Sequence, residues 1–202
     1  YGTFVRALGP AQALSPTGEV QILIPPIRET GFRLNIGLTE IVGGEAGLEV
    51  TVKDRLGAPK GVLRETVGPY SLKQINDIYA VLAITPDKDD RIEVKTYAGG
   101  GRVLAFGSAV DNETNDSFLV NGSRPVTDML LPAAAHAAGQ FDARFLTDLK
   151  LANPHPFPVR ARISYIPTTG PAFDSVVVPV GANGTRLLDD VLELLFWPFE
   201  DV

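Results

Sequence analysis

The sequence contains no cysteine, which excludes disulfide bonds and thiolate chemistry. It has only two histidines, so side chains suited to acid–base catalysis near neutral pH are scarce. No run of about 18 apolar residues occurs, and the sequence therefore predicts no membrane-spanning helix. The net charge is −6 and there is no basic stripe, which argues against a nucleic-acid partner.

Motifs of known catalytic sites are missing as well. His136 lies in an alanine-rich stretch and His155 between two prolines, both positions typical of surface loops. Ser108 is not part of a Gly-x-Ser-x-Gly elbow, and Gly99–Gly101 lacks the Lys-Ser/Thr pair of a phosphate-binding loop. The sequence therefore predicts that the protein is not an enzyme.

The composition suits folded domains with many turns. The 202 residues give room for two compact domains, and hydrophobic and charged residues make up 45% and 21% of the chain. The 20 glycines and 16 prolines are typical of short strands joined by turns. The chain begins with Tyr1 rather than methionine, so we expect a processed product or a piece of a longer protein.

A strand pattern occurs twice in the sequence. Large apolar residues stand at every second place of Phe32–Thr39, and again in Phe145–Ala152, where Thr147 is the one weak inward position. This period of two predicts a half-buried strand in each place, with Phe32 and Phe145 facing a core. Leu48–Val52 and Val159–Ile163 likewise share an alternation of apolar and polar residues. Phe32 and Phe145 are about 113 residues apart, as are Ile75 and Leu188, and this fixed offset predicts two copies of one domain.

Each copy also contains one predicted helix. Ile75, Ile78, Tyr79 and Leu82 have the spacing of one helix face, and Leu188, Val191, Leu192 and Leu195 repeat it. Asn76-Asp77 and Asp189-Asp190 stand near the two helix starts. We interpret these residues as helix caps, in preference to a metal site or an acid–base pair at Asp189-Asp190.

The order of elements predicts an all-β fold of two tandem immunoglobulin-like β-sandwich domains, each with one short helix before the final hairpin. In the first copy we expect that hairpin to join Arg91–Ala98 and Arg102–Val110 around Gly99–Gly101. The cysteine pair and core tryptophan of antibody domains are absent. The predicted organisation has three parts: a closing strand or tail of a preceding repeat over 1–14, a first sandwich over 15–125, and a second over 126–202 that is incomplete at its C-terminal end.

Three segments of the first copy, residues 32–38, 74–79 and 103–116, resemble tandem immunoglobulin-like repeats of large bacterial secreted and cell-surface proteins. Gly139–Pro154 is similar to the opening of such a repeat, and Gly2–Val5 to its closing strand. The resemblance implies an extracellular, cell-surface β-sandwich that acts as a spacer, adhesive or filament-building module. It supplies no catalytic residues.

One turn is rich in oxygen ligands. A Ca²⁺ ion could use the side chains of Asp111, Asn112, Glu113, Asn115 and Asp116. Such turns are also common without metal, because their side chains bind their own backbone. We favour the second interpretation and expect no cofactor, with calcium as the alternative.

Assembly is the functional hypothesis that the sequence favours. The incomplete second sandwich would leave open edges and apolar surface near its helix, and a strand at the start of another chain could fill them. The interface predicted in this way consists of Gly2, Thr3, Phe4, Val5, Leu195, Phe196, Trp197 and Phe199.

We therefore expect a non-catalytic structural module whose partners are further copies of itself or neighbouring repeats, joined head to tail. One alternative is that the chain is a fragment of a longer array with frayed ends. Another is a glycan- or protein-binding accessory module of a secreted enzyme. Aromatic residues make up 8% of the chain and form no clear solvent-facing stripe, so the structural module is favoured.

Overall fold

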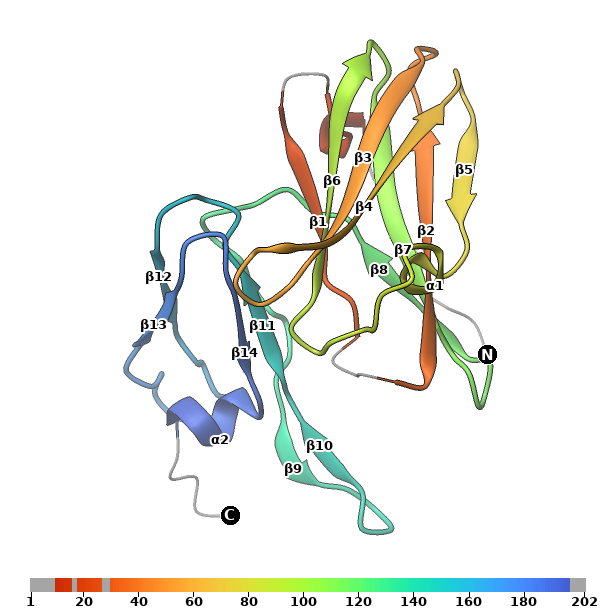
Figure 1. Ribbon diagram of the computed structural model, residues 1–202. Coiled ribbons are helices and arrows are strands. Elements are labelled where there is room, and N and C mark those ends of the chain that lie inside the picture. The colour runs from red at the N-terminus through yellow and green to blue at the C-terminus, as the bar shows by residue number, and fades with distance from the viewer. Residues whose placement is uncertain (1–9, 16–17, 27–29, 197–202) are drawn as a thin grey trace. The chain divides into compact units, whose positions relative to one another are not determined.

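Antiparallel β-strands make up most of the secondary structure in the computed structural model, which describes residues 10–15, 18–26 and 30–196 (Figure 1). The all-β class predicted from the sequence is confirmed. The chain divides into two units, unit 1 (Tyr1–Pro125) and unit 2 (Val126–Val202).

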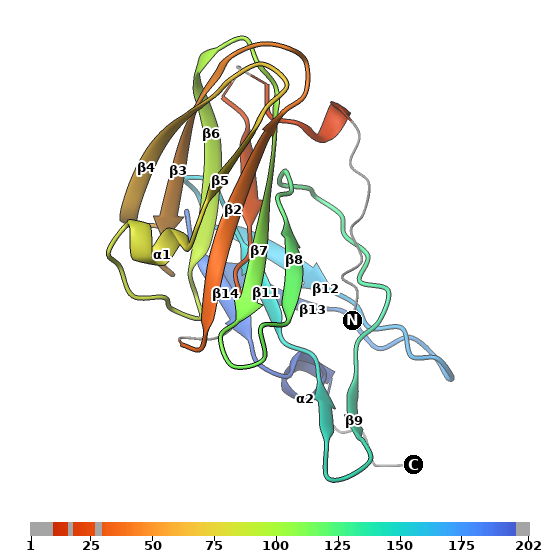
Figure 2. The ribbon, with the colours of Figure 1, turned by 90° about the vertical axis from the view of Figure 1, so that its right-hand side faces the viewer.

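Unit 1 contains two four-stranded antiparallel sheets, which Figure 2 shows as two layers. One sheet has the order β1-β6-β3-β4, formed by Val20–Leu23, Arg91–Gly99, Ala46–Lys53 and Pro59–Val67. The other has the order β5-β2-β7-β8, formed by Leu72–Ile75, Phe32–Glu40, Val103–Asp111 and Ser117–Asn121.

The two sheets of unit 1 enclose a single core. The alternation predicted for β2 is confirmed, because Phe32, Leu34, Ile36 and Leu38 are all buried. The opposite sheet contributes Leu48, Val50 and Val52 from β3 to the same cluster. Unit 1 is thus a two-layered sandwich whose layers are joined by alternate apolar side chains.

The N-terminal boundary of this sandwich differs from the prediction. The 3₁₀ turn Pro10–Gln12 is followed by Ala13 and Leu14, which are both fully buried. Leu14 pairs with Val103 and belongs to the core of unit 1. The sequence prediction had assigned this residue to the tail of a preceding repeat.

The hairpin predicted over Arg91–Val110 is wrong, because β6 and β7 lie in different sheets. Gly99, with φ of 84°, and Gly101 carry the chain from one layer to the other. A Cβ atom at either position would overlap backbone atoms of Gly44 or Glu45, so this crossing depends on glycine. We call such a pair of strands, one in each sheet, a β-arch. The final hairpin of unit 1 is β7–β8.

The helices are shorter than predicted. α1 spans Ile78–Val81 and α2 spans Val191–Phe196, whereas Ile75 ends strand β5 and Leu188 ends strand β14. The residues just before the two helices, Asp77 and Asp190, have φ of 46° and 44°. A helix cannot run through these left-handed residues, which explains the later starts. Asp77 occupies the cap position, but its side chain makes no capping hydrogen bond.

Unit 2 contains three two-stranded antiparallel ladders and α2 among its described residues. β9 (His136–Ala138) pairs with β10 (Arg144–Leu146), β11 (Leu149–Ala152) with β14 (Thr185–Leu188), and β12 (Val159–Ile163) with β13 (Val176–Val180). Its small core combines Val178 and Leu188 with Val191, Leu192 and Phe196 of α2.

The single strand predicted over Phe145–Ala152 is interrupted at its weak position. The Thr147 hydroxyl donates to the carbonyl of Ala135 and accepts from its N–H, and the strand is split there into β10 and β11. Phe145 consequently belongs to the β9–β10 hairpin and is 60% exposed, so its predicted inward position is wrong.

Two ladders of unit 2 have the same register as two ladders of unit 1. The pair Ile36↔Ile75 between β2 and β5 is matched about 113 residues later by Leu149↔Leu188 between β11 and β14. The pair Ala46↔Val67 is matched at the same spacing by Val159↔Val180. We call residues related by this spacing counterparts. A one-residue slip would turn every side chain to the other face, so the agreement fixes which faces correspond.

Candidate functional site

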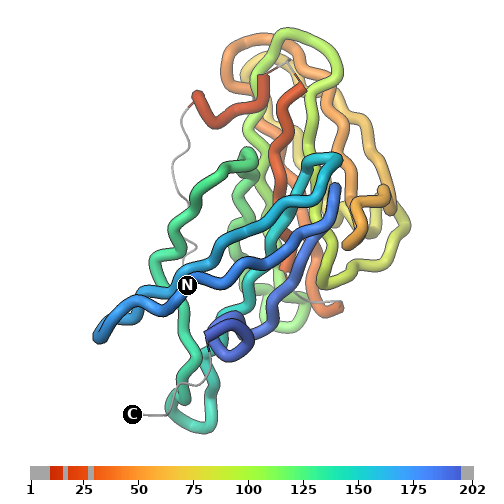
Figure 3. Tube along the Cα trace, turned by 90° about the vertical axis from the view of Figure 1, so that its left-hand side faces the viewer, coloured from red at the N-terminus to blue at the C-terminus, as the bar shows by residue number. Residues whose placement is uncertain are grey.

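The most distinctive feature of unit 2 is that its two counterparts of central strands each have one ladder partner among the described residues. In unit 1, β2 lies between β5 and β7, and β3 lies between β4 and β6. Their counterparts β11 and β12 each have one partner among the described residues, β14 and β13 respectively. Figure 3 traces β11 to β14 of unit 2 in cyan and blue, and among the described residues no ladder occupies the sides of β11 and β12 that correspond to the β7 side of β2 and the β6 side of β3. We call them the open edges of β11 and β12.

Apolar side chains beside the open edges are less buried than their counterparts. Ile36, Leu38, Leu48, Val50 and Val52 of unit 1 are fully buried. The five counterparts are only half-buried: Leu149, Leu151, Ala161, Ile163 and Tyr165. A strand side without a ladder, next to incompletely covered apolar side chains, is the kind of surface to which another strand can add.

The predicted interface near α2 is corrected in one position. Phe196 is 6% exposed and packs against the rings of Tyr165 and Phe173, so it is a core residue rather than an open surface. Leu195 is half-buried beside the same core. The other predicted interface residues, Gly2, Thr3, Phe4, Val5, Trp197 and Phe199, lie outside the described residues.

Three of the five side chains proposed as calcium ligands in the turn Asp111–Asp116 already accept hydrogen bonds, namely Asp111, Asn112 and Asn115. The Asp111 carboxylate accepts from the N–H groups of Glu113 and Thr114, at 2.8 and 3.0 Å. The Arg33 guanidinium donates to the amide oxygens of Asn112 and Asn115, at 3.0 and 3.4 Å. A guanidinium at the place where a metal would bind adds charge repulsion.

We expect the melting temperature of the protein to be the same with millimolar Ca²⁺ and with a chelator, because the turn supplies its own donors and a cation. Differential scanning calorimetry measures this directly. A rise of several degrees with Ca²⁺ would contradict the assignment, since a ligand that binds only the folded form stabilises it.

A second group with metal-ligand chemistry was not predicted. His136, Asp190 and Glu193 offer ligand atoms within 4.8 Å of one another. The Nδ1 atom of His136 lies 2.6 Å from an Asp190 carboxylate oxygen, and Asp148 accepts a hydrogen bond from the Asp190 N–H. His136 was predicted to lie in a surface loop, but here it ties the start of β9 to the start of α2. The group is explained as a structural contact.

Two buried polar residues act as anchors of turns at counterpart positions. The Glu40 carboxylate accepts from the backbone N–H groups of Val42, Gly43, Tyr70 and Arg102, at 2.8 to 3.0 Å. Burial raises the pKa of Glu40, but these four donors outweigh it and lower the pKa to about 2.

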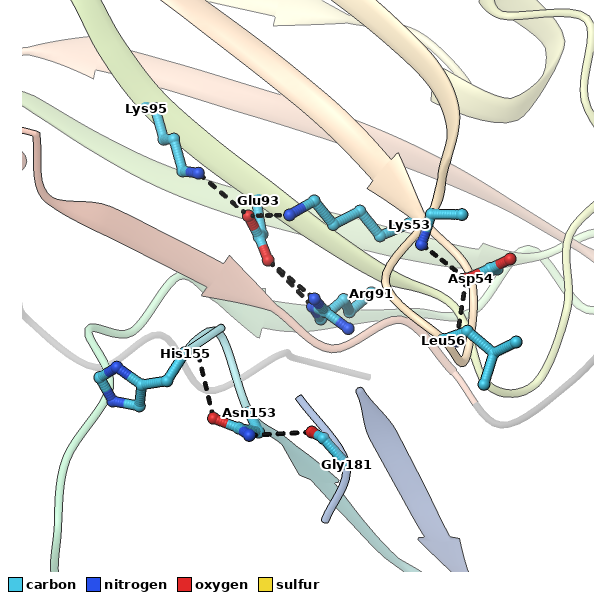
Figure 4. Close-up of polar contacts among 10 residues, drawn as sticks. Lys53, Asp54, Leu56, Arg91, Glu93, Lys95, Asn153, His155 and Gly181 are labelled. Atoms are coloured by element: carbon cyan, nitrogen blue, oxygen red, sulfur yellow. Dashed lines mark hydrogen bonds and ion pairs between the residues drawn. The ribbon is translucent and has the colours of Figure 1, made fainter. Parts of the chain in front are cut away.

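Asn153, the counterpart of Glu40, accepts a hydrogen bond from the His155 N–H and donates to the carbonyls of Phe157 and Gly181. Figure 4 shows the contacts with His155 and Gly181. Sequence analysis missed both residues. The signal was a polar residue at the inward place of an alternating strand.

Charged residues on β3 and β6 form a compensated cluster (Figure 4). Glu93 accepts from Arg91 Nε at 3.0 Å and lies 2.8 Å from Lys53 Nζ and 3.4 Å from Lys95 Nζ. Burial raises the pKa of Glu93, and the lysine and arginine outweigh it, so the pKa lies below its usual range. An ionised carboxylate held by cations is a structural group rather than a general base.

A shallow hollow of about 350 Å³ is lined by Lys60 of β4 and by loop residues of unit 1, namely Asp54, Arg55, Leu56, Asp87, Asp89 and Asp90. Lys60 binds both Asp90 carboxylate oxygens and the Thr85 carbonyl. Asp54 accepts from two N–H groups of its own turn. These bonds explain Asp54 and Asp90 as residues that hold the loops around them in place.

Comparisons with known proteins assign no family. No family model matches the chain, and no curated protein matches it significantly. A solved structure described as "Crystal Structure of Thermotoga maritima 1070" is similar to 52% of this chain and 91% of its own, with 14% sequence identity and a TM-score of 0.40. A likeness at that TM-score carries no argument about fold or function. Neither described helix has the length and apolar character needed to span a membrane.

Proposed function

We propose that the chain is a non-catalytic structural module of an extracellular bacterial surface or filament-forming protein, built from tandem immunoglobulin-like repeats. The observation that carries this proposal is the shared register of β2–β5 with β11–β14, and of β3–β4 with β12–β13. Left-handed residues recur at the same spacing, as Tyr70 and Asn183 show. Duplication of one sandwich explains both observations, and arrays of such modules serve as spacers and filaments.

Assembly by strand complementation gives this module its role. The open edges of β11 and β12 offer backbone groups to a strand from another repeat. A contact between two different surfaces of identical molecules continues without limit unless a rotation closes it, so this mode of assembly builds filaments. The partners are other copies of the chain or neighbouring repeats of the same protein.

A second candidate is a glycan- or protein-binding accessory module of a secreted enzyme. It is favoured by exposed aromatic side chains on the β9–β10 hairpin, where Phe141 and Phe145 are 97% and 60% exposed. Exposed aromatic rings are common contact residues of binding surfaces.

Mass and ligand retention separate the two candidates. For the structural module, we expect light scattering to show a mass that rises with protein concentration, and polysaccharide columns to give no retention. A mass that stays at one copy at every concentration, together with retention that Phe141→Ala abolishes, would favour the accessory module instead. Lys88→Ala is a matched surface control, because Lys88 is also exposed but lies in unit 1.

A further inference from the structure

We propose that the structural contact between His136 and Asp190 is also part of a metal site, in which these two residues and Glu193 bind one divalent transition-metal ion of the Zn²⁺ class. The ligand atoms of the three side chains lie within 4.8 Å of one another. His136 begins β9 and Glu193 belongs to α2, so the bound ion ties the β9–β10 hairpin to the helix. The site lies within unit 2 and is independent of the assembly proposed above.

Contacts within the protein account for only one oxygen of the Asp190 carboxylate. Its Oδ2 atom lies 2.6 Å from His136 Nδ1, whereas its Oδ1 atom is buried and has no hydrogen-bond partner. The side chain is 13% exposed, so water has little access to that oxygen. The sequence had suggested a helix cap, but a cap would use this oxygen to accept from a backbone N–H. A buried acceptor without a donor is costly, and a metal ion satisfies it.

The turn before α2 is built like the turn before α1. The Asn35 amide oxygen accepts from the Asp77 N–H at 3.0 Å, and the Asp148 carboxylate accepts from the Asp190 N–H at 2.8 Å. Asp77 and Asp190 also have nearly the same φ, 46° and 44°. An amide therefore holds this turn as well as a carboxylate does. The structural bond alone does not explain why unit 2 carries a charged residue at Asp148.

Unit 2 adds side chains of the metal-ligand type around this shared turn. At a spacing of 113 residues, unit 1 has Leu23 where unit 2 has His136, and Ala80 where unit 2 has Glu193. Leu23 belongs to the core of unit 1, and neither Leu23 nor Ala80 offers a ligand atom. The differences between the two units thus bring an imidazole and a further carboxylate to one place. Metal binding explains this convergence, whereas folding of the turn does not require it.

The carboxylates around the site have no cation of their own. Among the described residues, no lysine or arginine forms an ion pair with Asp148, Asp190 or Glu193. The buried carboxylates Asp90 and Glu93 of unit 1, by contrast, are each paired with a lysine. Neighbouring carboxylates repel each other, and a divalent cation between them removes the repulsion.

The ligand types indicate the class of metal. One imidazole nitrogen with two carboxylate oxygens suits Zn²⁺ and its first-row neighbours, whereas Mg²⁺ and Ca²⁺ prefer oxygen ligands alone. Asp148 is a positioning residue rather than a ligand, because it holds the Asp190 backbone through the Asp190 N–H. Such supports of the ligands tune metal affinity.

Isothermal titration calorimetry of the full chain tests the site. The protein is treated with a chelator and dialysed, and Zn²⁺ is titrated into it. We expect one Zn²⁺ ion per chain, and at least about tenfold weaker binding after His136→Ala or Glu193→Gln. Glu193 is exposed, so Glu193→Gln removes a ligand without disturbing the core. His155→Ala is the matched control at the other histidine, and we expect it to bind Zn²⁺ like the parent.

Two further measurements separate metal binding from a purely structural role. Asp148→Asn gives unit 2 the amide that Asn35 provides in unit 1, so we expect metal-free protein of unchanged stability that binds Zn²⁺ about tenfold more weakly. Hydrogen exchange should slow in β9, β10 and α2 when Zn²⁺ is added, and stay unchanged in β2 and β3. A ligand that binds only the folded form of unit 2 protects that unit alone.

Three results would overturn the metal site: no Zn²⁺ binding by the parent, equal affinity in the parent and in either ligand variant, or loss of binding in His155→Ala. The calcium comparison at Asp111–Asp116 uses the same metal-free protein, so the two sites are measured separately. Neither the mass in solution nor retention on polysaccharide enters this test, and its outcome is therefore distinct from that of the proposed function.

Discussion

Replacing Gly99 by alanine is expected to destabilise unit 1 by about 2–4 kcal/mol. Gly99 has φ of 84°, a region that an L-residue enters only with strain. The new Cβ would also overlap the backbone carbonyl of Glu45, which cannot move without disturbing β3. The effect follows from the crossing between sheets, where the chain passes close to the neighbouring loop.

Gly100→Ala is the matched control, because a Cβ at Gly100 meets nothing within 4 Å. We expect this variant to be as stable as the parent or slightly more stable, since alanine restricts the unfolded chain. Native-state hydrogen exchange of the β2 and β3 amides reports the stability of unit 1 alone. A single melting temperature of a chain with two units does not separate the stabilities of the two units. Equal exchange rates in Gly99→Ala and Gly100→Ala would contradict the claim that the crossing between the two sheets requires glycine at position 99.

Replacing Glu40 by alanine is expected to cost unit 1 about 3 kcal/mol or more, because four backbone N–H groups lose a charged acceptor. These donors come from three segments: the turn after β2, the residue Tyr70 before β5, and Arg102 before β7. Loss of the carboxylate therefore loosens three connections at once. Glu45→Ala, at an exposed position of the same turn, is expected to change little.

The contribution of Glu40 also depends on pH. Its pKa is about 2 in the folded protein against an ordinary value of 4.5, so the folded state favours the ionised form. The stabilisation is therefore complete above pH 4.5 and is lost as pH falls from 4.5 towards 2. We expect Glu40→Gln to be less stable at pH 7 and to lack this part of the acid dependence. A parallel loss of stability in parent and Glu40→Gln between these pH values would contradict the anchor role.

Alternation and spacing allowed much of the architecture to be predicted from the sequence. The period of two in Phe32–Thr39 predicted the buried face of β2, and Val159–Ile163 was predicted with the bounds that β12 has. The spacing of about 113 residues anticipated ladders that agree in register. These features are local or periodic, so a single sequence contains them.

Other features depend on tertiary context. The glycines at 99–101 are compatible with a hairpin and with a crossing, and only the pairing of β6 with β3 and of β7 with β2 distinguishes the two. The left-handed conformations of Asp77 and Asp190 shorten both helices although the apolar spacing continues. The anchor role of Glu40 requires donors from residues 70 and 102, which are distant in sequence.

Hydrogen exchange of the full chain tests the central claim that unit 2 repeats the strand pairing of unit 1, with β11–β14 matching β2–β5 and β12–β13 matching β3–β4. At concentrations where one copy is present, we predict faster exchange in β11 and β12 than in β2 and β3. Within each matched ladder, we predict protection of the amides that the shared register pairs, such as those of the pairs Leu149↔Leu188 and Val159↔Val180. Exchange in β11 and β12 as fast as in an unfolded chain, or a pattern of protected amides shifted by one residue from that of β2 and β3, would contradict the account.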